Sequence, residues 1–98
     1  MSIKKQVIKT KPVVKVTFSI EAKEANTAAV VGDFNNWNQS EGELSKLKNG
    51  TFKGVFDLPK DNSFEFKYLV DGNYVNEPQA DSYRWNEFAN AENSVLEV

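Results

Sequence analysis

The sequence predicts an all-β protein whose strands form a two-layered sandwich, and three observations support this prediction. Hydrophobic and polar residues alternate with a period of two in several short segments, which is the spacing of half-buried strands. Asparagine–glycine and aspartate–glycine pairs, which favour tight hairpin turns, separate some of these segments. No segment keeps helical spacing for more than a turn or two. A sandwich of short antiparallel strands therefore fits the chain.

The first half of the chain contains two predicted strands. Between Val14 and Ile20, hydrophobic residues occupy every second position. The segment AAVVG, residues 28–32, is a continuous apolar run that suits a central strand. We expect residues 1–12 to form either a flexible tail or an extra edge strand, because VIKTKP contains lysines and a proline. Residues 13–98 are expected to form the domain.

Asn49-Gly50 is the next turn signal. Both residues accept positive φ, so the sequence predicts a hairpin with a type I′ turn here. The segment after the turn alternates hydrophobic and polar residues and is predicted as a strand. Residues 76–92 show little periodicity, and the final segment NSVLEV is predicted as the closing strand.

The segment SFEFKYLV, followed by Asp71-Gly72, gives the clearest strand and hairpin signal. If Asp71-Gly72 is a two-residue loop, Leu69 pairs with Tyr74, and both side chains project from the same face. Lys67 shares this outer face because of the period of two, whereas the aromatic residues on either side of Lys67 face the core. We therefore expect Lys67 and Tyr74 to be diagonal neighbours, about 7–8 Å apart.

About seven short strands separated by turns in one chain of this length describe an immunoglobulin-like β-sandwich. Their shared alternation predicts which side chains fill the space between the sheets. The predicted core residues are Phe18, Val30, Phe56, Phe66, Tyr68, Val70 and Leu96.

The composition excludes several classes of function. The chain has 98 residues, with 12 basic and 14 acidic side chains interspersed, and so lacks the concentrated basic face of a nucleic-acid-binding protein or a membrane anchor. It contains no cysteine and no histidine, which excludes disulfides, zinc-finger sites and catalysis by either residue. We expect no cofactor and no metal. The N-terminal residues contain no long apolar run, so the expected location is the cytoplasm.

Two aromatic residues stand outside the predicted core. Tyr74, beside Lys67, is either part of a ligand platform or only an exposed strand position with favourable β-propensity. Trp37 lies between asparagines in VVGDFNNWN, and its indole either closes one end of the sandwich or is displayed to a ligand. We expect display, with residues 33–38 forming a tip that leans across the face of Lys67 and Tyr74.

Three segments, VVGDFNNWN, FKYLVDGNY and NSVLEV, resemble in this order family 48 of the carbohydrate-binding modules. This family is also known as the isoamylase early-set domain and includes the glycogen-binding domain of AMP-activated protein kinase β subunits. The resemblance covers residues 13–98, and the segment NEFANAENSV is also similar to small free-standing bacterial early-set proteins. It implies an early-set β-sandwich that binds α-1,4-linked glucans such as glycogen, starch and maltodextrins.

The resemblance also implies which residues bind the glucan. Trp37 matches the tryptophan of the family's F-N-x-W motif, and Tyr74 matches a second tryptophan; both tryptophans stack on glucose rings. Lys67 matches a lysine that hydrogen-bonds sugar hydroxyls, and Asn93 matches the asparagine that opens the last strand. Stacking suits glucose because one side of the sugar ring is an apolar C–H face, while amide and ammonium groups suit its rim of hydroxyls.

The chain departs from the family pattern at two places. Tyr74 offers less stacking area than tryptophan, so a lower affinity is expected. Kinase-type members insert a leucine from the last loop into the glucan turn, and this chain has no leucine there; Phe88 is the nearest candidate. Trp85 has no counterpart, and it either covers the edge of the sandwich or extends the sugar platform.

Two functions from different classes remain open. The first is non-catalytic α-glucan binding, in the service of a glycogen-metabolising enzyme or a kinase-like partner. The second is an early-set domain that has lost its sugar site and acts as a protein-interaction or spacer unit. The aromatic pair favours the first, because a spacer has no reason to keep both rings exposed. A glycosidase needs two carboxylates about 5–10 Å apart in a cleft, whereas Asp33, Asp71 and Glu77 lie at predicted turns.

Overall fold

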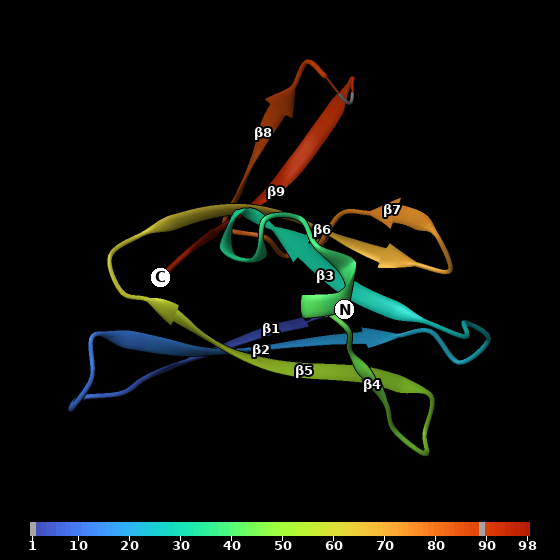
Figure 1. Ribbon diagram of the computed structural model, residues 1–98, viewed down its shortest axis with the longest axis horizontal. Coiled ribbons are helices and arrows are strands. Elements are labelled where there is room, and N and C mark those ends of the chain that lie inside the picture. The colour runs from blue at the N-terminus through green and yellow to red at the C-terminus, as the bar shows by residue number, and fades with distance from the viewer. Residues whose placement is uncertain (1, 89) are drawn as a thin grey trace.

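The computed structural model describes residues 2–88 and 90–98 as a sandwich of two antiparallel sheets (Figure 1), which is the predicted all-β, immunoglobulin-like arrangement. The first sheet has the order β1-β2-β5-β4 and consists of β1 (Ser2–Val7), β2 (Val13–Glu21), β5 (Thr51–Pro59) and β4 (Ser45–Lys46). The second sheet has the order β3-β6-β9-β8 and consists of β3 (Ala28–Gly32), β6 (Ser63–Val70), β9 (Ala91–Glu97) and β8 (Ser82–Asn86). A short strand, β7 (Asn73–Val75), pairs with β6 beside this path.

Within the described residues the chain forms nine strands, more than the sequence predicts. Strand β1 pairs with β2 along its whole length, so residues 2–7 form an edge strand, while Met1 lies outside the described part. Strand β8 falls in the stretch that shows little periodicity. Its side chains are exposed or half-exposed on both faces, so no alternation marks it in the sequence.

Helical structure among the described residues is limited to two 3-10 turns, η1 (Asp33–Asn35) and η2 (Gln39–Glu41). Both follow β3 in the loop that leads to β4. No helix in the described ranges has the length and apolar character needed to cross a membrane.

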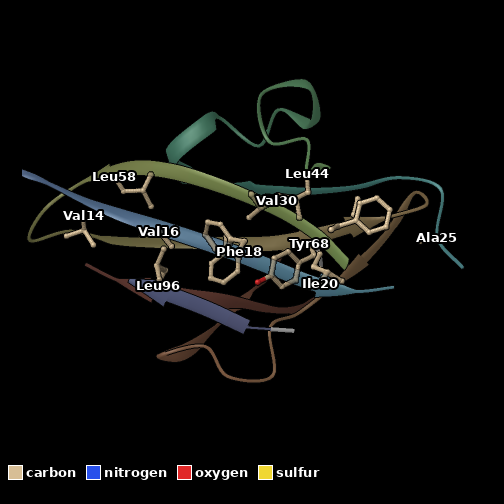
Figure 2. Close-up of a cluster of buried hydrophobic side chains, with 13 residues drawn as sticks. Val14, Val16, Phe18, Ile20, Ala25, Val30, Leu44, Leu58, Tyr68 and Leu96 are labelled. Carbon is tan, nitrogen blue, oxygen red and sulfur yellow. The ribbon is translucent and has the colours of Figure 1, made fainter. Parts of the chain in front are cut away.

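The core lies between the sheets, where alternate residues of β2 meet the inner faces of β3, β6 and β9 (Figure 2). The ring of Phe18 is central, with its centroid 5.5 Å from that of Phe66 and 6.1 Å from that of Tyr68. The prediction of buried core residues is confirmed for Phe18, Val30, Phe66, Tyr68 and Leu96.

For Phe56 and Val70 the prediction is confirmed only in part: both pack against the core, but they are half-buried. Val70 is the last residue of β6 and lies next to an exposed turn. Phe56 lies at the margin of the core, with its ring 5.9 Å from that of Phe34, which is itself only partly buried. A period of two therefore predicts the face from which a side chain projects but not how deeply it is covered.

The two predicted hairpins are present, but one has a different turn. Asp71 and Gly72 both have positive φ (48° and 83°), so the two-residue loop is confirmed. At the other hairpin, Leu47 N donates to Thr51 O (2.7 Å) and Gly50 N donates to Leu47 O (3.0 Å). Gly50 alone of the Asn49-Gly50 pair has positive φ, which is the three-residue loop with a left-handed glycine rather than the predicted type I′ turn.

Strand β3 is buried but is not central in its sheet. It pairs with β6 on one side, and residues 42–44 cover its other edge: Val30 N donates to Gly42 O (2.8 Å) and Leu44 N donates to Ala28 O (2.9 Å). An added Cβ at Gly42 would lie 1.8 Å from Val30 O, so only glycine allows this close approach. All five residues of β3 are buried, which explains why an outer strand has an entirely apolar sequence.

Candidate functional site

Trp37, Lys67, Tyr74 and Asn93 line one hollow of about 220 Å³ on the outer face of the β3-β6-β9 sheet, together with Asn86. They come from five different places: the loop after β3, strands β6, β7 and β9, and the end of β8. Leu69 pairs with Tyr74 as the hairpin predicts, so Tyr74 and Lys67 share the outer face. The structure therefore brings together all four residues that the resemblance implies.

The indole of Trp37 is held in place by a carboxylate. Trp37 Nε1 donates to Asp33 Oδ1 (3.2 Å), while the other carboxylate oxygen of Asp33 accepts from Glu65 N (2.9 Å). Asp33 thus ties the loop after β3 to β6 and fixes the ring at the border of the hollow. Because the indole N–H is already used and 38% of Trp37 is exposed, its ring surface is what remains for a ligand.

The backbone at Trp37 is strained. Asn36 and Trp37 have φ values of 55° and 57°, in the left-handed region that bulky residues rarely occupy. Buried Asn35 holds this turn, since its Oδ1 accepts from Gly32 N and its Nδ2 donates to Val30 O, both at 3.0 Å. Such conformations cost about 1–3 kcal/mol and concentrate at functional sites. The strain is therefore consistent with a fold that displays Trp37.

Two side chains that border the same hollow have hydrogen-bonding atoms that are unused in the described part of the chain. Lys67 is 9% exposed, and its ammonium has no hydrogen bond or ion pair there. Asn93 is 3% exposed and donates through Nδ2 to Glu65 Oε1 (3.2 Å), which leaves its Oδ1 unused among the described residues. The hollow thus offers one strong donor and one acceptor beside the rings of Trp37 and Tyr74.

An adjoining hollow of about 370 Å³ shares Trp37, Asn86 and Asn93 with the first, and Trp85 and Phe88 border it instead. Phe88 is fully exposed. Trp85 is 56% exposed, so it does not cover the edge of the sandwich, which was one of its two predicted roles. It pairs with Glu92, whereas Arg84 pairs with Asn93, so Trp85 projects from the face of the β8–β9 hairpin opposite to Asn93.

Sequence reasoning missed Asn86, Asp33 and Glu65 as parts of the site. Asn86 lies at the end of β8, and nothing in an aperiodic stretch indicates that it comes next to Trp37. Asp33 stands four residues before Trp37 in the polar tip, which was a usable signal for a local hydrogen bond. Glu65 stands two residues before Lys67 on the same face of β6, but its contact with Asn93 depends on pairing between β6 and β9.

The three acidic residues predicted at turns differ in environment. Asp71 holds the loop that precedes β3: backbone hydrogen bonds from Thr27 and Asn26 lower the pKa of its carboxyl. Glu77 contradicts the prediction of an ordinary turn residue, because it is completely buried and neither carboxylate oxygen has a hydrogen-bond partner in the described residues. Burial raises the pKa of Glu77.

Three carboxylates border the adjoining hollow, and two of them are used structurally, whereas Glu87 is exposed and has no hydrogen bond or ion pair among the described residues. Asp33 uses one oxygen for Trp37 and the other for the backbone of β6. Glu65 uses one oxygen for Asn93 and the other for Arg84 (Nη1 to Oε2, 3.3 Å). Within residues 2–88 and 90–98, no group of three or more Asp, Glu, His or Cys side chains is arranged to hold a metal ion.

Comparison with known families identifies the family of the chain. The sequence model of the family described as carbohydrate-binding module 48 (isoamylase N-terminal domain) matches residues 6–87. The match includes Trp37, Lys67 and Tyr74 and ends before Phe88 and Asn93. A search of curated proteins finds no match to this chain. Because the family match covers most of the sequence, the chain belongs to family 48 of the carbohydrate-binding modules.

Proposed function

We propose that this protein binds α-1,4-linked glucans such as glycogen, starch or maltodextrins and does not cleave them. The observation that carries the proposal is the hollow in which Trp37 and Tyr74 stand beside the Asn93 amide and the Lys67 ammonium, which has no partner among the described residues. Aromatic rings cover the apolar faces of glucose, and the two polar groups engage its hydroxyls. Binding of this kind in the cytoplasm would hold a glycogen-metabolising enzyme or a kinase-like partner at the glucan.

The alternative of a spacer domain without a sugar site accounts poorly for two features. A spacer does not need a tryptophan held in a strained conformation by Asn35 and Asp33. It also does not need Lys67, a largely covered residue whose ammonium lacks a hydrogen bond or counter-charge within the described residues. The ammonium borders the hollow, so its hydrogen bonds are available to a ligand.

Changes at Tyr74 test the proposal. Tyr74 is 65% exposed, so substitutions there should leave the fold intact. Tyr74→Trp should tighten maltoheptaose binding about 2- to 12-fold, because the larger ring adds about 0.5–1.5 kcal/mol of stacking. Tyr74→Ala should weaken binding by at least as much. Titration calorimetry on the parent and both variants measures these changes.

The matched control is Val55→Ala, an exposed hydrophobic strand residue on the outer face of the other sheet. It should bind maltoheptaose as the parent does. A second control ligand is cellohexaose, whose β-1,4 linkages give an extended chain of the same sugar, and it should bind more weakly. If Tyr74→Ala binds as well as the parent, Tyr74 is outside the site; if the parent binds neither sugar, the proposed function is wrong.

Purified protein should release no reducing sugar from starch or maltooligosaccharides. Asp33 and Glu65 each use both carboxylate oxygens for structural hydrogen bonds, so among the described residues Glu87 is the one free carboxylate at the hollows, and a single carboxylate is not an acid–base pair. A reducing-sugar assay at high protein concentration checks this expectation. Hydrolysis that co-purifies with the protein and disappears in Asp33→Asn or Glu65→Gln would show that the protein is an enzyme.

A further inference from the structure

Glu65 links the two sides of the site without bordering the hollow formed by Lys67 and Tyr74. It lies on the outer face of β6, two residues before Lys67, and pairs with Val95 on β9. Its Oε1 accepts from Asn93 Nδ2 at 3.2 Å, and its Oε2 lies 3.3 Å from Arg84 Nη1. The side chain is 23% exposed, so both contacts are partly shielded from water. One carboxylate therefore restrains Asn93 while Arg84 restrains the carboxylate.

The chemistry of a carboxylate fixes which way the Asn93 amide points. An ionised carboxylate only accepts hydrogen bonds, whereas an amide has a donating NH₂ at one end and an accepting oxygen at the other. Asn93 must therefore turn its Nδ2 toward Glu65 and its Oδ1 away from it. Without Glu65, the amide could rotate and present either end to the hollow.

This orientation gives the hollow a defined polarity. Lys67 can only donate, and Asn93, held by Glu65, presents an acceptor. A sugar hydroxyl both donates and accepts, so one hydroxyl or two adjacent hydroxyls can satisfy Lys67 and Asn93 together. If the amide were reversed, the site would present two donors and leave the hydroxyl hydrogen without an acceptor, which is unfavourable in a desolvated contact.

We propose that Glu65 is a positioning residue that makes Asn93 a hydrogen-bond acceptor, so that the site selects ligands with free hydroxyl groups. This inference rests on the proposed glucan binding and deepens it. A competing explanation is that Glu65 contacts the glucan itself, since Glu65 borders the adjoining hollow. The two explanations differ in how the effects of Glu65 and Asn93 combine.

The test is a double-mutant cycle measured by titration calorimetry with maltoheptaose. Glu65→Leu should weaken binding about 5- to 10-fold. Glu65→Gln should stay within about 3-fold of the parent, because a glutamine oxygen can still accept from Asn93 Nδ2. In an Asn93→Ala background, Glu65→Leu should cause no further loss. Glu65→Thr, which favours strands and is too short to reach Asn93, repeats the test if the leucine variant folds poorly.

The matched control is Glu92→Leu, a carboxylate on the same strand as Asn93 that pairs with Trp85 and faces the other way. Its affinity should equal that of the parent. Equal losses from Glu65→Leu in both backgrounds, or a Gln variant as weak as the Leu variant, overturn the inference while glucan binding stands. A parent protein that binds no maltoheptaose overturns the proposed function and this role of Glu65 together.

Discussion

Replacing Trp37 with alanine is expected to abolish retention of the protein by glycogen while leaving the sandwich folded. Trp37 borders both hollows, so its removal takes away the central stacking surface. Truncating a tryptophan at the centre of a binding surface typically costs about 2 kcal/mol or more, a loss of at least about 30-fold in affinity. Migration through native gels with and without glycogen measures the loss.

The stability of Trp37→Ala distinguishes an indole that is displayed to a ligand from one that fills the end of the sandwich. A buried tryptophan loses about 3–5 kcal/mol on truncation to alanine. Trp37 is partly exposed, and its substitution removes one hydrogen bond to Asp33, so we expect a loss of about 1 kcal/mol from that bond. Leu47→Ala, an exposed hydrophobic residue on the hairpin between β4 and β5, is the control and should keep glycogen retention. A collapsed melting temperature for Trp37→Ala would show that the indole is a structural plug.

Replacing Glu77 with methionine is expected to stabilise the protein at neutral pH. Glu77 is completely buried, and its carboxylate oxygens and the neighbouring hydroxyl of Tyr68 lack hydrogen-bond partners among the described residues. Methionine fills a similar volume without a polar group, so the free energy of unfolding should rise by about 1–3 kcal/mol at pH 7. Glu77→Gln removes the charge but keeps a polar group, and its gain should be smaller.

The effect at Glu77 should depend on pH in one direction. Burial raises the pKa of Glu77 above its ordinary value of 4.5. The folded state thus holds the proton more tightly than the unfolded chain, so Glu77 contributes most stability below pH 4.5 and loses that contribution as pH rises through the folded pKa.

Thermal unfolding of parent and Glu77→Met from pH 4 to pH 8 measures this dependence. The advantage of the variant should be smallest at pH 4 and grow toward pH 8. All other carboxylates are common to both proteins, so their titration cancels in the difference. The interpretation is contradicted if the stability advantage of Glu77→Met over the parent is constant across this range, or if it is smaller at pH 8 than at pH 4.

The parts of the fold that the sequence predicts well are those encoded locally. The β6–β7 hairpin follows from strict alternation and from Asp71-Gly72, and the same register places Lys67 and Tyr74 on one face. Strand β8 was not predicted because neither of its faces is buried. Its sequence therefore lacks the alternation of hydrophobic and polar residues that marks a half-buried strand. The same exposure hides Asn86, whose place in the site depends on a pairing with β9 that no local signal reports.

Contacts between distant segments set the remaining limits. The resemblance implies a role for Asn93, but the orientation of its amide depends on Glu65, which lies 28 positions away. The burial of Glu77 likewise cannot be seen in a stretch of turn-forming residues, because it results from packing near Tyr68 between the sheets. Sequence periodicity describes one strand at a time, whereas the polarity of the site arises from side chains on the three strands β6, β8 and β9.

The cover on β3 has a consequence for how the protein behaves in a crowded solution. AAVVG is short, apolar and rich in β-branched valine, and an exposed edge of this kind is a template for pairing with strands of other molecules. The backbone of residues 42–44 already occupies that edge, and Gly42 permits the contact because any side chain would collide with Val30 O. Resistance to self-association thus depends on a glycine in the same loop that carries Trp37 to the binding site.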